Sequence, residues 1–104
     1  MQISAQSTEY LRVSVIASVN GTLIDPGADS VAFAVVSGVP GVTDWLAGSW
    51  ESGHSAATGG VARILVGPTG GAKTLTAGQY DVWIKITDSP EVPIRKVAAL
   101  QVTN

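Results

Sequence analysis

The chain has 104 residues, of which 45% are apolar and 13% charged, with a formal net charge of −2 at pH 7 and no cysteine. This length predicts one domain with its own core. The composition excludes a disulfide framework and a cysteine-ligated metal. The net charge argues against nucleic acid as a main partner, and no run of 18 apolar residues is present to cross a membrane.

The low charge content is the most informative departure from an average domain. Charged residues usually make up about 25% of a soluble domain, and they keep its exterior in water. A fraction of 13% suggests that neighbours in an assembly cover much of this exterior. A small, neutral β domain rich in serine and threonine explains the same number equally well. The first 13 residues lack the basic and apolar regions of a secretory signal, and the absence of cysteine fits a reducing cytoplasm.

The first quarter of the chain predicts an arm followed by a hairpin. Residues 1–8 are mostly polar and are expected to form an N-terminal arm, loose or laid against a partner. The single domain then covers residues 9–104. Residues 10–19 alternate between apolar and polar, which is typical of a half-buried strand. Asn20-Gly21 predicts a two-residue hairpin turn into a short strand over 22–24.

The middle of the chain predicts three more strands. Residues 31–36 form an apolar run that is expected to be buried, with Val31, Phe33 and Val35 pointing inward. Residues 44–51 carry two tryptophans five positions apart, and Gly48 between them is a candidate bulge. Residues 61–66 form the next strand.

Residues 75–87 predict the strand that organises the fold. Leu75, Gly78 and Tyr80 form a Leu-x-x-Gly-x-Tyr pattern that resembles the tyrosine corner of immunoglobulin-like sandwiches, in which the tyrosine bonds to the upstream backbone. Strict alternation follows and places Tyr80, Val82, Ile84 and Ile86 on the core side. With a last strand over 94–103, the sequence predicts an all-β, immunoglobulin-like antiparallel sandwich of seven or eight strands without a disulfide.

The motifs that resemble catalytic or ligand sites are better explained as turns. Residues 67–74, GPTGGAKT, nearly spell a phosphate-binding loop, but a strand follows where that motif requires a helix. His54 is the sole histidine and is expected in an exposed loop, without the rigid partners of a catalytic triad. Asp25 and Asp29 match no calcium-binding loop. The sequence therefore predicts no catalytic residue, no metal site and no cofactor.

The aromatic residues indicate a binding surface instead. Trp83 lies on the face opposite the predicted core side, and an outward Arg63 would bring Val61 and Leu65 outward with it. A tryptophan among apolar neighbours on an outer face often marks an interface. The alternative is that a loop or the arm covers Trp83. One of Trp45 and Trp50 is expected in the core and the other exposed, and an exposed tryptophan could also stack on sugars.

Four segments together resemble small virion structural proteins of tailed phages that infect actinobacteria. These segments are YLRV (10–13), DW and GSWE (44–45 and 48–51), ARILVGP (62–68), and GQYDVW leading into TDSPEVPIR (78–83 and 87–95). The resemblance implies an immunoglobulin-like protein of the head or head–tail region, without enzymatic activity or cofactor. Two prolines between the last two strands would hold Glu91 and Arg95 in a fixed geometry toward a neighbour, unless this is an ordinary turn.

These observations predict a multi-copy virion component that is assembled in the host cytoplasm. Its expected partner is the major capsid protein, another virion protein or its own copies, in capsid decoration or cementing. The expected interface residues are Trp83, Arg63, Trp45, Trp50, Glu91 and Arg95. A head–tail connector or tail component is one alternative, and a carbohydrate-binding or adhesion module is the other.

Overall fold

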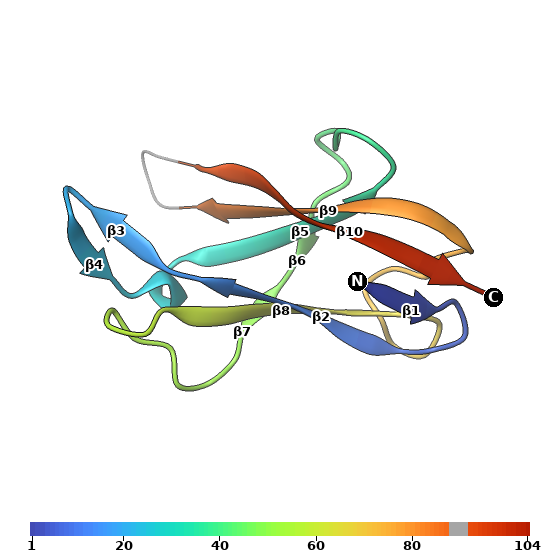
Figure 1. Ribbon diagram of the computed structural model, residues 1–104, viewed down its shortest axis with the longest axis horizontal. Coiled ribbons are helices and arrows are strands. Elements are labelled where there is room, and N and C mark those ends of the chain that lie inside the picture. Colours follow the sequence, from blue (N-terminus) through green and yellow to red (C-terminus); the bar gives the residue numbers. More distant parts are fainter. Residues whose placement is uncertain (88–91) are drawn as a thin grey trace.

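Two packed β-sheets and a projecting hairpin make up the protein (Figure 1). The computed structural model describes residues 1–87 and 92–104. The larger sheet has the strand order β1-β10-β9-β5-β6, the smaller sheet β2-β8-β7, and β3 and β4 form the hairpin. The strands are β1 (Gln2–Ser4), β2 (Glu9–Val15), β3 (Ala17–Val19), β4 (Thr22–Ile24), β5 (Ser30–Val36), β6 (Leu46–Ala47), β7 (Ser49–Trp50), β8 (Gly60–Val66), β9 (Gly78–Thr87) and β10 (Ile94–Thr103). The predicted all-β sandwich without a disulfide is confirmed.

Helical structure in the described part of the chain is limited to one 3₁₀ turn, η1 (Pro26–Ala28). Asp25 begins this turn because its carboxylate accepts a hydrogen bond from the backbone N–H of Gly27 at 2.9 Å. Within the described ranges, no helix has the length and apolar character needed to span a bilayer.

The strand count exceeds the predicted seven or eight because two predicted strands are each divided and a further strand forms. The strand predicted over residues 10–19 breaks at Ile16 into β2 and β3, and the strand over 44–51 breaks at Gly48 into β6 and β7. The predicted arm, residues 1–8, contains β1, which pairs with β10 of the same chain. This pairing is parallel, whereas the other strand pairs are antiparallel.

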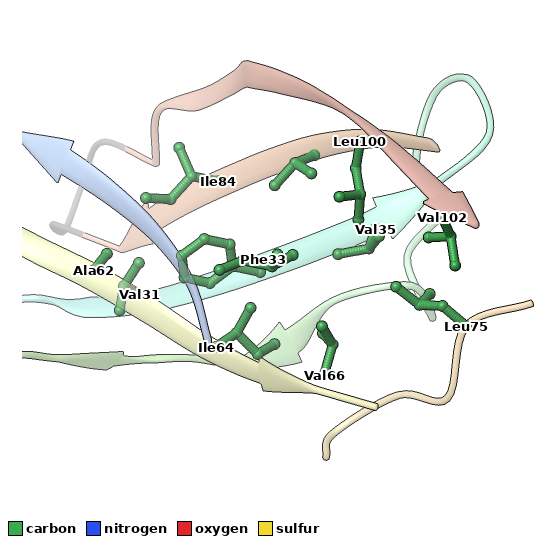
Figure 2. Close-up of a cluster of buried hydrophobic side chains, with 12 residues drawn as sticks. Val31, Phe33, Val35, Ala62, Ile64, Val66, Leu75, Ile84, Leu100 and Val102 are labelled. Carbon is green, nitrogen blue, oxygen red and sulfur yellow. The ribbon is translucent and has the colours of Figure 1, made fainter. Parts of the chain in front are cut away.

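The core lies between the two sheets and is built by alternate residues of β2, β5, β8, β9 and β10 (Figure 2). As the alternation predicts, Val82 and Ile84 of β9 are buried, and Tyr80 and Ile86 pack against them at the two ends. Phe33 is the largest fully buried side chain. The inward set predicted on β5 is confirmed, since all three of its members are buried. The buried cluster comprises Leu11, Val31, Phe33, Val35, Ala62, Ile64, Val66, Leu75, Val82, Ile84, Leu100 and Val102.

The chain changes sheets at Gly48. Leu46 pairs with Phe33 in the larger sheet, whereas Trp50 pairs with Ala62 in the smaller one. Between them, the Gly48 N–H donates to the Val31 carbonyl at 2.9 Å. A Cβ atom on Gly48 would lie only 2.7 Å from a ring carbon of Phe33, so a residue without a side chain is needed at this crossing. The predicted irregularity at Gly48 is therefore a change of sheet, which closes one side of the sandwich.

Tyr80 makes the hydrogen bond that the Leu-x-x-Gly-x-Tyr pattern predicts. Its hydroxyl donates to the Thr76 carbonyl at 2.8 Å, four residues upstream, and lies 3.2 Å from the Thr76 hydroxyl. Its half-buried ring packs against the core, and Leu75 at the start of the pattern is buried in it. The corner therefore holds the loop before β9 against the end of the sandwich.

We expect Tyr80→Phe to lower the free energy of unfolding by about 0.5–1.5 kcal/mol, because it removes one hydrogen bond and keeps the ring packing. Urea unfolding followed by tryptophan fluorescence measures this change. Tyr10→Phe is the matched control, because Tyr10 is more exposed and its ring contacts with arginine persist in phenylalanine. Equal stability of the two variants would show that the corner bond contributes nothing.

Candidate functional site

The predicted interface residues lie in different parts of the molecule. Trp83 and Trp45 belong to the outer face of the larger sheet, Arg63 to the outer face of the smaller sheet, and Arg95 to an opening between the sheets. Glu91 lies outside the described residues.

On the outer face of the larger sheet, the loop of residues 37–45 covers Trp83. The Trp83 indole N–H donates to the Gly38 carbonyl at 3.0 Å, and the Gly38 N–H donates to the Asp81 carboxylate at 3.3 Å. The Lys85 ammonium lies 4.6 Å from the centroid of the Trp45 ring. Both indoles are half-buried, so contacts within the chain occupy much of this face.

Trp50 is a structural residue of the interior. Its half-buried ring packs against the core, and its indole N–H donates to the Asp29 carbonyl at 2.8 Å, which fixes the turn before β5. The expectation that one of Trp45 and Trp50 is exposed is wrong, because both are half-buried and the Lys85 ammonium lies over the Trp45 ring.

The outer face of the smaller sheet carries a cluster of two arginines, one tyrosine and one glutamate. Arg63 points outward, and its guanidinium lies 4.4 Å from the centroid of the Tyr10 ring. Arg12 forms an ion pair with Glu51 at 2.6 Å, and Arg63 lies 4.0 Å from the same carboxylate. The Arg63 Nε is buried, and no described residue accepts a hydrogen bond from it. Pairing within the cluster leaves this face with a small positive charge.

The opening between the sheets is a mainly apolar hollow. On this side β1 pairs only with Gln101–Thr103 of β10, so the Ile94–Val97 part of the β10 edge has no strand neighbour among the described residues. β2 is the edge strand of the smaller sheet and lies across the gap. The hollow between these edges, here called the β2/β10 slot, has a volume of about 470 Å³. Its lining residues are Val13, Ser14, Val15, Ile16, Ala17, Ser18, Ile24, Asp29, Ile84, Ile86, Pro93, Arg95 and Val97.

Two exposed apolar side chains, Ile16 and Val97, line the slot and form its rim. Ile16 is 70% exposed at the break between β2 and β3, and Leu23 in the neighbouring hairpin is 46% exposed. Val97 of β10 is 36% exposed, whereas Val92 and Ile94, which are also exposed, are not among the lining residues. A bulge between Lys96 and Ala98 shifts the register with β9 there. The slot therefore joins an apolar interior to an apolar rim, a feature that marks interaction surfaces in soluble proteins.

His54 has a partner that the sequence did not predict. Its Nδ1 lies 2.9 Å from both carboxylate oxygens of Asp25, 29 positions away. Partial desolvation acts to raise the pKa of Asp25, but the hydrogen bond from Gly27 and the contact with His54 lower the pKa below its usual value. The nearby hydroxyls of Ser55 and Thr58 bond to each other at 2.7 Å. This pair ties the loop of residues 51–59 to η1, and in the described ranges no three potential metal-binding side chains gather.

Sequence reasoning missed the slot and its exposed rim. The alternation of apolar and polar residues in β2 and β9 predicts which face of each strand is buried. It does not predict which strands lie at the edges of the sheets or which edges stay uncovered. The run of apolar residues at 92–94 and the apolar Ile16 within a polar face were the available signals.

Comparison with protein-family models, with curated proteins and with solved structures finds no match to this chain.

Proposed function

We propose that this protein is a non-enzymatic structural component of a phage virion, which binds the major capsid protein or its own copies. Decoration or cementing of the shell is the favoured role, and a minor capsid, head–tail or tail position is the alternative within the same particle. The observation that carries the proposal is the β2/β10 slot with its apolar rim. Exposed apolar side chains at the mouth of a mainly apolar hollow are typical of a surface that binds a partner.

Two features of the sequence support a place in a repetitive particle. Only 13% of the residues are charged, as expected for a surface that neighbours cover. The segments around residues 10–13, 44–51, 62–68 and 78–95 resemble small virion proteins of actinobacterial phages. In a shell with many copies, several modest contacts act together and produce a large avidity, so no single contact has to be strong.

The tryptophans give less support to a carbohydrate-binding module. Stacking on a sugar requires an open indole face, and Trp50 and Trp83 are half-buried with their N–H groups bonded to backbone carbonyls. Lys85 lies over the ring of Trp45. The slot, in contrast, is lined mainly by aliphatic side chains, which suit a protein partner.

Co-sedimentation with purified phage heads that lack the protein tests this proposal. We expect saturable binding with many copies per head, and a loss of about tenfold or more in affinity for Val97→Lys, because a buried lysine in the slot would have to be desolvated. Ala57→Lys adds the same charge at an exposed site outside the slot and should bind as wild type does. No binding to heads, or equal binding by the two variants, would contradict the proposal.

A further inference from the structure

Arg63, in the middle of β8, is a partly buried cation that lacks acceptors in the described part of the chain. Its Nε is buried, and no described residue accepts a hydrogen bond from it. The nearest carboxylate oxygen among the described residues belongs to Glu51 and lies 4.0 Å away, which is too far for a hydrogen bond. Only 33% of the Arg63 side chain is exposed, so water reaches only part of it. Leaving such donors without acceptors costs stability.

The strand register places a second arginine directly opposite Arg63. Arg12 of β2 pairs with Arg63 across the smaller sheet, and like charges at opposite positions destabilise a strand pair. Both guanidiniums lie beside the Tyr10 ring, at 5.4 and 4.4 Å from its centroid. The Glu51 carboxylate accepts a hydrogen bond from Arg12 at 2.6 Å. Two guanidiniums therefore share one carboxylate, which is bound to Arg12, and one positive charge is left over.

A hollow of about 290 Å³ opens beside Arg63 on this outer face. Among the described residues that line it, Arg63 is the only charged one. The lining, here called the Arg63 hollow, includes Tyr10, Ser49, Arg63, Leu65, Gly70 and Ala72. Ser49 pairs with Arg63 in the strand register and adds a hydroxyl group. A group that enters the hollow therefore meets an unmatched positive charge between largely apolar walls.

The chemistry of the Arg63 hollow favours a carboxylate over a phosphate. A carboxylate is planar and carries one charge, so it matches both the guanidinium fork and the single positive charge left over in the cluster. Binding of nucleic-acid phosphates requires many clustered cations, whereas Glu51 already occupies Arg12 and the chain has a net charge of −2. The volume lies at the lower limit of ligand pockets, roughly 300–1,000 Å³, and suits one side chain rather than a cofactor.

We propose that the Arg63 hollow binds the carboxylate of an aspartate or glutamate side chain of a partner protein, with the Arg63 guanidinium as its ion-pair partner. The Tyr10 ring holds the guanidinium in place, and the bound carboxylate gives each arginine of the cluster a carboxylate of its own. The hollow shares no lining residue with the β2/β10 slot. The site is therefore a second contact surface, and it does not depend on the docking role of the slot.

Titration of the full chain with the tripeptide acetyl-Gly-Glu-Gly-amide tests this site. Heteronuclear NMR follows the Nε–H signal of Arg63 and the backbone amides of β8. We expect saturable shifts with a Kd of about 1–10 mM, since a single ion pair at a partly exposed site binds weakly. The matched peptide acetyl-Gly-Gln-Gly-amide should give no saturable shift, and inorganic phosphate should bind about tenfold more weakly than the glutamate peptide.

Three variants separate the site from a general effect of charge. Arg63→Gln should weaken binding of the glutamate peptide by about tenfold or more. Lys96→Gln removes the same charge beside Asp81 on the larger sheet and should bind as wild type does. Glu51→Gln removes the carboxylate that competes inside the cluster and should tighten binding by about threefold or more. An arginine with only a structural role would give no such gain.

Several results would overturn the inference. They are the absence of a saturable shift up to about 100 mM glutamate peptide, equal binding of the glutamine peptide, and unchanged binding by Arg63→Gln. Phosphate binding as tight as that of the peptide would overturn the choice of a carboxylate. Thermal unfolding shows whether each variant is folded, and Glu51→Gln still decides the question if Arg63→Gln is not. Head binding is measured separately with Val97→Lys, so failure of this site and failure of the proposed function are distinguishable.

Discussion

Phe33→Ala should lower the free energy of unfolding by about 3–5 kcal/mol, the largest effect expected for a single substitution in this chain. Phe33 is fully buried in the middle of the core, where β5 faces β8 (Figure 2). Removal of its ring leaves a cavity between the two sheets. The hydrogen-bonded strands on either side cannot move together to fill this cavity. A small domain has a total stability of about 5–15 kcal/mol, so the variant should be close to unfolding at room temperature.

Urea unfolding followed by fluorescence of the three tryptophans and by far-ultraviolet circular dichroism measures this loss. Phe33→Leu is the matched control, since it keeps an apolar side chain and should cost about 1.5 kcal/mol or less. A loss below about 1 kcal/mol for Phe33→Ala would mean that the packed core lies elsewhere.

Gly48→Ala should destabilise the protein by about 1–3 kcal/mol through overpacking, although alanine is only one methyl group larger. The added Cβ would lie 2.7 and 2.8 Å from two ring carbons of Phe33 and 3.1 Å from the Arg63 carbonyl. Neither neighbour can retreat easily, because Phe33 is enclosed by the core and the Arg63 carbonyl belongs to the β8 backbone. The added methyl group therefore strains the backbone at residue 48, where the chain passes from one sheet to the other.

Gly41→Ala controls for the change of residue type. A Cβ on Gly41 would be 3.5 Å from an Asp44 oxygen, an ordinary contact distance, and its N–H remains available to that carboxylate. Differential scanning calorimetry should show a lower Tm for Gly48→Ala than for Gly41→Ala. Equal melting temperatures would show that the chain relaxes around residue 48 without cost.

Local patterns in the sequence predicted the elements whose structure depends on local chemistry. Alternation over residues 80–87 identified the core face of β9, and Asn20-Gly21 predicted the hairpin between β3 and β4. Asn20 and Gly21 do adopt positive φ, at 50° and 80°, as a two-residue turn of this kind requires. The Tyr80 bond to Thr76 spans only four residues, so it too could be predicted from the sequence.

Features that depend on residues far apart could not be predicted in this way. The pairing of β1 with β10 joins the two ends of the chain, and the change of sheet at Gly48 depends on how close Phe33 comes to the backbone. The slot exists because β1 covers only Gln101–Thr103 at the end of the β10 edge. None of these relations leaves a periodic signal in the segment concerned.

The tryptophans illustrate the same limit at the candidate site. Sequence pattern placed Trp83 correctly on the outer face, but it could not show that Gly38, 45 positions away, accepts the indole hydrogen bond. The proposed interface is therefore the slot rather than the tryptophans. Of the interface residues predicted from the sequence, Arg95 lines the slot.

Hydrogen–deuterium exchange of peptides covering residues 92–98 and 12–18, measured in the isolated protein and in assembled heads, tests the docking role of the slot most directly. The uncovered edges of β10 and β2 should exchange readily in the isolated protein and become protected by about tenfold or more in the particle. Unchanged exchange in both peptides, with protection over residues 81–85 instead, would place the interface on the outer face of the larger sheet and contradict this account.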